Sequence, residues 1–138
     1  MTTTYFLNNI MGNVFKVNGA GNALPSAYYL GLSSTNPADE VTEPYASADN
    51  TTGYKRVKLE DLIISDEVGG EVTNKNAVSF EESTGDWGTM HYFVIYDSEE
   101  NGNLLMYDKL ESSRSVEPAT VVTVKPGSLK ITLTSPAE

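Results

Sequence analysis

Oxygen-bearing side chains at alternate positions form the most suggestive metal-binding pattern of the chain. Asp97, Glu99 and Asn101 precede Gly102, and Asp108 follows six residues later. Such ligands can converge on Ca²⁺ around a glycine bend. However, Glu99 stands where calcium loops have Asp or Asn, Asp108 is too short to act as the bidentate Glu, and the flanking residues are typical of strands. We therefore expect an acidic turn without a metal, and these four residues are the weak metal candidates.

Catalytic chemistry has few starting points in this sequence. His91 is the only histidine, so any Ser-His-Asp relay or two-histidine metal site would have to use it. It lies in a predicted strand, and the Gly-x-Ser-x-Gly pattern is absent. Acids are paired at Glu81-Glu82 with Asp86, at Asp39-Glu40 with Glu43, and at Glu99-Glu100. All lie in predicted loops, where carboxylates are mostly solvated. We expect no catalytic residue, no cofactor and no enzyme.

Three aromatic residues are the candidate interaction residues. Trp87 is flanked by Gly85 and Gly88, and it is the only tryptophan. Such a residue is either an exposed contact residue or a plug at the end of the core, and we favour the plug. Tyr45 and Tyr54 complete the set, because aromatic rings can also stack against sugars. A carbohydrate- or calcium-binding β module therefore stands as an alternative function.

Composition limits the domain count and the partners. A chain of 138 residues fits one domain, which we assign to residues 1–138. It has no cysteine, and nine basic residues against nineteen acidic ones give a net charge of −10. An acidic protein is repelled by phosphate backbones, so we expect no nucleic acid as partner. We also expect no secretion signal and no membrane insertion, since apolar runs are short.

The first 17 residues form the predicted helix. Two interleaved sets of apolar residues recur at helical spacing, and either Thr3 or Thr4 is the predicted N-cap. Asn18-Gly19 and Gly21 are predicted to end the helix. The apolar residues are Phe6, Ile10 and Val14 in one set and Leu7, Met11 and Phe15 in the other.

The remaining sequence is typical of an all-β domain. After Pro25, short β-branched and aromatic runs alternate with clusters of Gly, Pro, Asn and Asp. We predict a single antiparallel β-sandwich, mainly β, with one short N-terminal helix. The predicted strands are residues 27–32, 54–64, 77–80, 90–97, 103–110, 120–124 and 129–133.

Turn chemistry predicts two hairpins. Pro126-Gly127 suits a type II turn between the last two strands, and Asn101-Gly102 suits the turn between the two most apolar strands. Residues 92–96 are apolar on both faces, which indicates a central strand. Residues 33–52 contain little that could pack, so they are predicted to be a long surface loop and the most mobile part of the chain.

Several short segments, read in order, carry a family resemblance. They are residues 28–37 (YYLGLSSTNP), Glu43-Pro44, residues 53–57 (GYKRV), residues 84–89 (TGDWGT) and residues 102–107 (GNLLMY). In this order and spacing they resemble a family of small tailed-bacteriophage virion proteins, over nearly the whole chain. The segment from Tyr45 to Thr52 is longer than in that pattern.

The resemblance implies a structural role. Members of this family are commonly described as phage tail-fibre or minor tail proteins, and they supply no catalytic residues. The implied function is a non-enzymatic virion component, most readily tail-associated, with other phage virion proteins as partners and assembly as a homo-oligomer. A capsid decoration protein or head appendage is an alternative within the virion.

Overall fold

The computed structural model describes residues 1–18, 24–45, 51–65 and 69–133. These residues contain one helix, α1 (Thr4–Val14), and nine strands. No helix among them is long and apolar enough to cross a membrane. The strands are β1 (Tyr29–Ser33), β2 (Val57–Lys58), β3 (Leu62–Ile64), β4 (Glu71–Asn74), β5 (Val78–Ser79), β6 (Gly88–Tyr96), β7 (Leu104–Val116), β8 (Thr123–Val124) and β9 (Lys130–Thr132).

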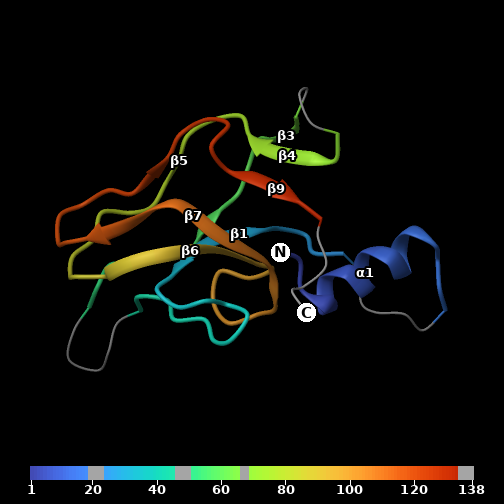
Figure 1. The fold of residues 1–138 in the computed structure, drawn as a ribbon, viewed down its shortest axis with the longest axis horizontal. Helices are drawn as coiled ribbons and strands as arrows, with labels where there is room; N and C mark the ends of the chain where they lie inside the picture. The colour runs from blue at the N-terminus through green and yellow to red at the C-terminus, as the bar shows by residue number, and fades with distance from the viewer. Residues whose placement is uncertain (19–23, 46–50, 66–68, 134–138) are drawn as a thin grey trace.

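Four strands form the larger antiparallel sheet, in the order β2-β1-β6-β7. Strand β6 lies inside this sheet, paired with β1 on one side and β7 on the other (Figure 1). Val94 and Ile95 on successive positions of β6 are both buried. The prediction that residues 92–96 form a central strand is therefore confirmed.

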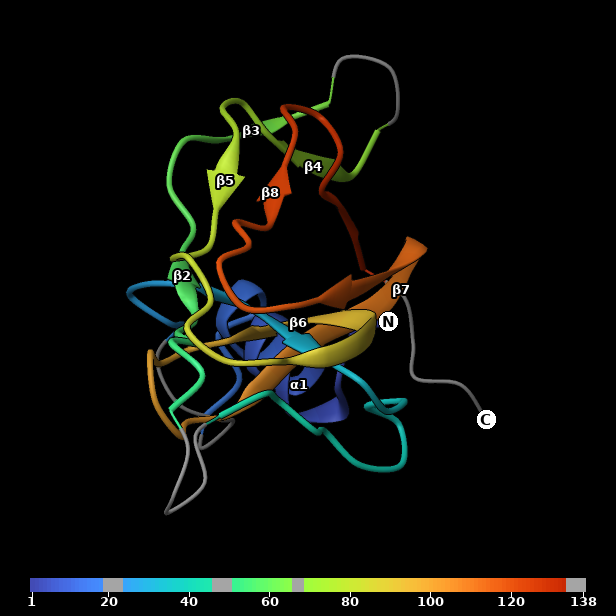
Figure 2. The same ribbon diagram turned by 90° about the vertical axis from the view of Figure 1, so that its left-hand side faces the viewer.

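The other strands lie over one face of this sheet, as Figures 1 and 2 both show. They form two small antiparallel sheets, with the orders β3-β4-β9 and β5-β8. One apolar cluster contains side chains from both layers, including Leu30 and Ile95 of the larger sheet and Val78 of β5. The predicted mainly β fold, with antiparallel sheets and an N-terminal helix, is confirmed.

The helix begins at the predicted cap. The backbone N–H of Phe6 donates to Thr3 Oγ1 at 3.3 Å, and the Thr3 hydroxyl lies 2.8 Å from the Leu104 carbonyl oxygen. The cap therefore also ties the helix to β7. Regular helix ends at Val14, three residues before the predicted end, and Gly19 and Gly21 lie outside the described residues.

The predicted strand at residues 54–64 is wrong as a single element. The chain forms β2 in the larger sheet and then β3 in a smaller one, with Asp61 between them at a φ of +54°. Strand β4 was not predicted, because its ends, Glu71 and Asn74, are polar. Asn74 is nevertheless buried, since its side chain bonds to the backbone of residues 76 and 125.

One of the two predicted hairpins is present. The turn at Asn101-Gly102 joins β6 to β7, and both residues have positive φ. The turn at Pro126-Gly127 also forms, with the Ser128 N–H donating to the Lys125 carbonyl at 3.0 Å. The hairpin predicted around it is wrong: β8 pairs with β5, and β9 pairs with β4.

The described part of the predicted loop at residues 33–52 contains no helix and, after Ser33, no strand. Ser33 Oγ accepts from the Thr42 N–H at 3.0 Å, and the Ser34 N–H donates to the Thr42 carbonyl at 3.0 Å. Residues 46–50 lie outside the described residues. The expectation that little in the loop could pack is wrong for Glu43, whose side chain is 6% exposed.

Candidate functional site

Among the ion pairs of the described residues, the pair of Arg56 and Glu43 is the buried one. Arg56 Nη2 lies 2.7 Å from Glu43 Oε1, and Arg56 Nε donates to Glu43 Oε2 at 3.0 Å. This two-pronged contact is the geometry that a guanidinium and a carboxylate prefer. The side chains of Arg56 and Glu43 are 4% and 6% exposed, so the loop carries a carboxylate into the interior.

Tyr54, two residues before Arg56, also hydrogen-bonds to the Glu43 carboxylate. Its hydroxyl donates to Glu43 Oε2 at 2.5 Å and accepts from the Leu32 N–H at 3.0 Å. Gly31 makes room for this arrangement, because a Cβ there would lie 2.5 Å from Tyr54 Oη and 2.9 Å from Glu43 Oε2. Strand β1 therefore needs a glycine where the loop carboxylate approaches it.

Arg56 also fixes the turn between β6 and β7. Its Nη1 donates to the carbonyl oxygens of Ser98 at 2.9 Å and Asn101 at 2.7 Å. The guanidinium carbon lies 3.6 Å from the centre of the Tyr96 ring, a cation–π contact. One cation thus joins the loop, strand β6 and the hairpin turn. We call Glu43, Tyr54 and Arg56 the buried cluster.

Trp87 lies beside the buried cluster, inside the protein. It is 5% exposed, its ring packs edge-on to Tyr54 at a centroid distance of 5.2 Å, and its indole N–H donates to the Thr52 carbonyl at 2.8 Å. Tyr54 is also 5% exposed, whereas Tyr45 is 43% exposed. The arrangement of Trp87 fits the core plug, and of the three candidate interaction residues Tyr45 alone presents a large exposed surface.

Burial changes the acid–base properties of the tyrosines around the pair. Desolvation raises the pKa of Tyr54 far above its usual value, and the charge and hydrogen bond of Glu43 raise it further. Desolvation followed by the charge of Glu43 also raises the pKa of Tyr96. Burial lowers the pKa of Arg56, but its hydrogen bonds to Glu43 and the charge of Glu43 outweigh this and leave the pKa raised.

The four metal candidates do not converge. Asp97 accepts from the backbone and side-chain nitrogens of Asn103, at 2.7 and 3.0 Å. Asp108 lies in β7, paired with Phe93, and the carbonyl of Asn101 faces Arg56. Glu99 is exposed. Among the described residues, no group of three or more His, Asp or Glu side chains is placed to hold a metal ion.

The candidate catalytic groups, apart from Glu43, lie at the surface. His91 is exposed on β6, at an irregularity of its pairing with β7. Asp39 and Glu40 are exposed, whereas Glu43, the third acid of that group, is buried on Arg56. The acids of the other groups, Glu81, Glu82, Asp86, Glu99 and Glu100, are exposed.

Sequence reasoning overlooked the role of Arg56 and treated Glu43 as a solvated acid. One signal could have indicated otherwise. Gly31, Glu43, Arg56 and Trp87 each lie in a different one of the segments on which the family resemblance rests. In the structure these segments meet around the Arg56–Glu43 pair, and their contacts with it stabilise the fold.

The sequence matches, over residues 1–132, the family described as Podophage GP4 fiber I protein gp80. The chain belongs to this family of phage fibre proteins, and it is a virion component. A comparison with curated proteins gave no match.

Removing Arg56 is expected to destabilise the protein severely. Arg56→Met leaves the buried Glu43 carboxylate without its counter-charge and removes the guanidinium donor of two backbone carbonyls, which costs about 3–5 kcal/mol. Lys55→Met is the matched control, because Lys55 contacts Glu81 at 3.9 Å in an exposed pair and its loss costs about 0–1 kcal/mol. Urea unfolding monitored by Trp87 fluorescence measures both, and equal losses would refute the role of the cluster.

Alkaline pH is expected to destabilise the protein through Tyr54. An unfolded tyrosine ionises near pH 10, whereas burial keeps the Tyr54 phenol protonated in the folded state, because its pKa is raised. The contribution of Tyr54 to the free energy of unfolding is fully present below about pH 10. Above that pH it declines by about 1.4 kcal/mol per pH unit. Tyr54→Phe is therefore expected to flatten the fall of the unfolding free energy between about pH 10 and 11.5.

Tyr5→Phe serves as the control for this titration. It removes a hydroxyl that lies 3.3 Å from Asn103 Nδ2, outside the buried cluster, and its profile is the reference for the slope of Tyr54→Phe. A Tyr54→Phe profile with the wild-type slope would contradict the assignment.

Proposed function

We propose that this protein is a non-enzymatic, tail-associated building block of a phage fibre, which acts through protein–protein assembly. Its membership of a phage fibre family supports this function. So does the one buried ion pair among the described residues, which cross-links the chain and in which the carboxylate of Glu43 accepts three hydrogen bonds. A structural subunit needs such rigidity, because its contacts must keep their positions in the assembly.

The outer face of α1 is the proposed joint. The inner face places Phe6 in the core, whereas Met11, Val14 and Phe15 are 53%, 61% and 67% exposed. With the half-buried Leu7 they follow the i, i+4, i+7, i+8 spacing of a helix face that packs against a partner. Figure 1 shows α1 at one end of the molecule, beside the sheets, where a neighbour can reach it.

A second copy of the chain is the proposed occupant of this face. Lys16 is the only charged residue among the first 38, so the remaining chain carries all nineteen acids against the other eight basic residues. Copies with this charge repel each other through most of their surface and can meet where charge is nearly absent. The helix has no acid in its first turn and no base in its last, and an antiparallel α1 of a second copy would complement its dipole.

Sedimentation over a range of protein concentrations tests this joint. We expect the wild-type protein to self-associate, and more strongly at high salt, because salt screens the repulsion between acidic copies. Phe15→Glu should weaken the association at least tenfold. Ile64→Glu is the matched control, since Ile64 is 66% exposed on β3, away from α1, and it should associate as the wild type does.

Two results would contradict the proposal. A protein that stays monomeric at every concentration and salt lacks the joint, and equal weakening by both variants would place it elsewhere. Labelling this subunit in intact particles separates the tail from the capsid, and label on the head would refute the tail assignment.

A further inference from the structure

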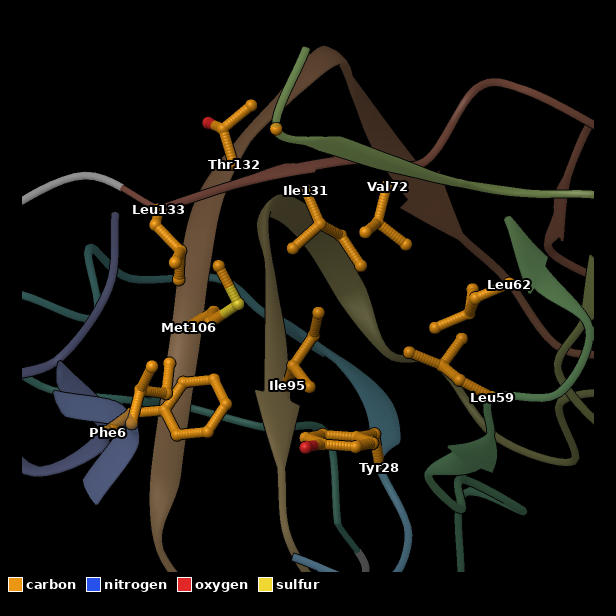
Figure 3. A pocket seen from close by; sticks show the side chains of 12 residues that line it. Phe6, Tyr28, Leu59, Leu62, Val72, Ile95, Met106, Ile131, Thr132 and Leu133 are labelled. Atoms are coloured by element: carbon orange, nitrogen blue, oxygen red, sulfur yellow. The ribbon is translucent and has the colours of Figure 1, made fainter. Parts of the chain in front are cut away.

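A second feature of the molecule has no part in the buried cluster or in the α1 joint. A cavity of about 330 Å³, open to solvent at one side, where Leu133 is 55% exposed, lies between the two layers of the fold, next to the inner face of α1. Figure 3 shows Ile95 and Met106 of the larger sheet on one side of it and Val72 and Ile131 of β4 and β9 on the other. The cavity thus separates the side chains of the larger sheet from those of β4 and β9.

The lining of this cavity is almost purely apolar. The described residues that line it include no charged side chain, and most are aliphatic or aromatic. Polar atoms come from Thr132, at one edge, and from Tyr28, whose hydroxyl end is directed toward Phe6 (Figure 3). The rings of Phe6 and Tyr28 are 6.1 Å apart. A ligand here would meet hydrocarbon on most sides and a phenol hydroxyl at one end.

The size of the cavity is that of a ligand site. Water in an open apolar cavity contacts hydrocarbon, and an apolar ligand that displaces this water is favoured by the burial of apolar surface. An enclosed apolar cavity of about 150 Å³ can bind benzene, and this one, although open at one side, is about twice as large. It is also at the lower end of the range for small-molecule sites, about 300–1,000 Å³.

We propose that this cavity binds a small uncharged molecule with an alkyl chain or aromatic ring, and that Tyr28 hydrogen-bonds to a neutral polar group at its end. An ionised group at the Tyr28 end is disfavoured, because the described residues of the lining offer no counter-charge and a buried unpaired charge is costly. This site is independent of the proposed assembly role: it uses the inner side of α1 and the sheet faces, whereas the joint uses the outer side.

Thermal unfolding and titration calorimetry with straight-chain alcohols test the proposal on the whole chain. Melting temperature should rise with alcohol concentration, since a ligand that binds the folded state stabilises it. Affinity should increase with chain length and then stop increasing once the cavity is full. Carboxylates of the same lengths should bind at least tenfold more weakly than the alcohols at pH 7.

Two variants locate the binding. Val72→Phe fills the cavity from β4 and should abolish the ligand-induced rise, whereas Val121→Phe makes the same change at a side chain that is 53% exposed and should retain it. Tyr28→Phe keeps the cavity and removes the hydroxyl, so it should weaken binding of alcohols and leave binding of benzene unchanged.

The results with the two variants distinguish binding in the cavity from binding elsewhere on the protein. Binding that Val72→Phe abolishes and Val121→Phe retains supports the site. No rise in melting temperature and no heat of binding with any alcohol or with benzene up to their solubility would overturn it. An equal rise in wild type and in a folded Val72→Phe would also overturn it. None of these results depends on self-association, which is measured separately.

Discussion

The charge of Arg56 inside the protein is the constraint on which much of the structure depends. A guanidinium can be removed from water only when a counter-charge and hydrogen-bond acceptors surround it. Here Glu43 of the long loop supplies the counter-charge, and two carbonyls of the β6–β7 turn supply the acceptors. The loop, the turn and Gly31 of β1 are therefore fixed together, although they are far apart in the sequence.

Features set by neighbouring residues could be predicted from the sequence, and features set by distant partners could not. The helix, its Thr3 cap and the Asn101-Gly102 turn follow from local spacing and turn chemistry. Strand β4 depends on pairing with β3 and β9, which no local pattern reveals. The Pro126-Gly127 turn formed as predicted, yet Asn74, about 50 positions away, bonds to it while its flanking strands pair elsewhere.

The same distinction applies to the site. Glu43 lies near Asp39 and Glu40 in the sequence and looks like one more solvated acid, but folding places it against Arg56. For Trp87 the flanking glycines favour a core plug over an exposed contact residue, whereas its bond to the Thr52 carbonyl depends on the fold. A family resemblance built on such segments therefore indicates a shared scaffold. Surface contacts, such as those proposed for α1, lie outside the buried cluster.

A double-mutant cycle on Arg56 and Glu43 tests the central claim most directly. The free energies of unfolding of the wild type, Arg56→Met, Glu43→Gln and the double variant give the coupling between the two side chains. If the ion pair holds the loop in place, the coupling is about 2–3 kcal/mol, and the double variant is far more stable than the two single losses would imply. Additive losses, within about 0.5 kcal/mol, would contradict the account.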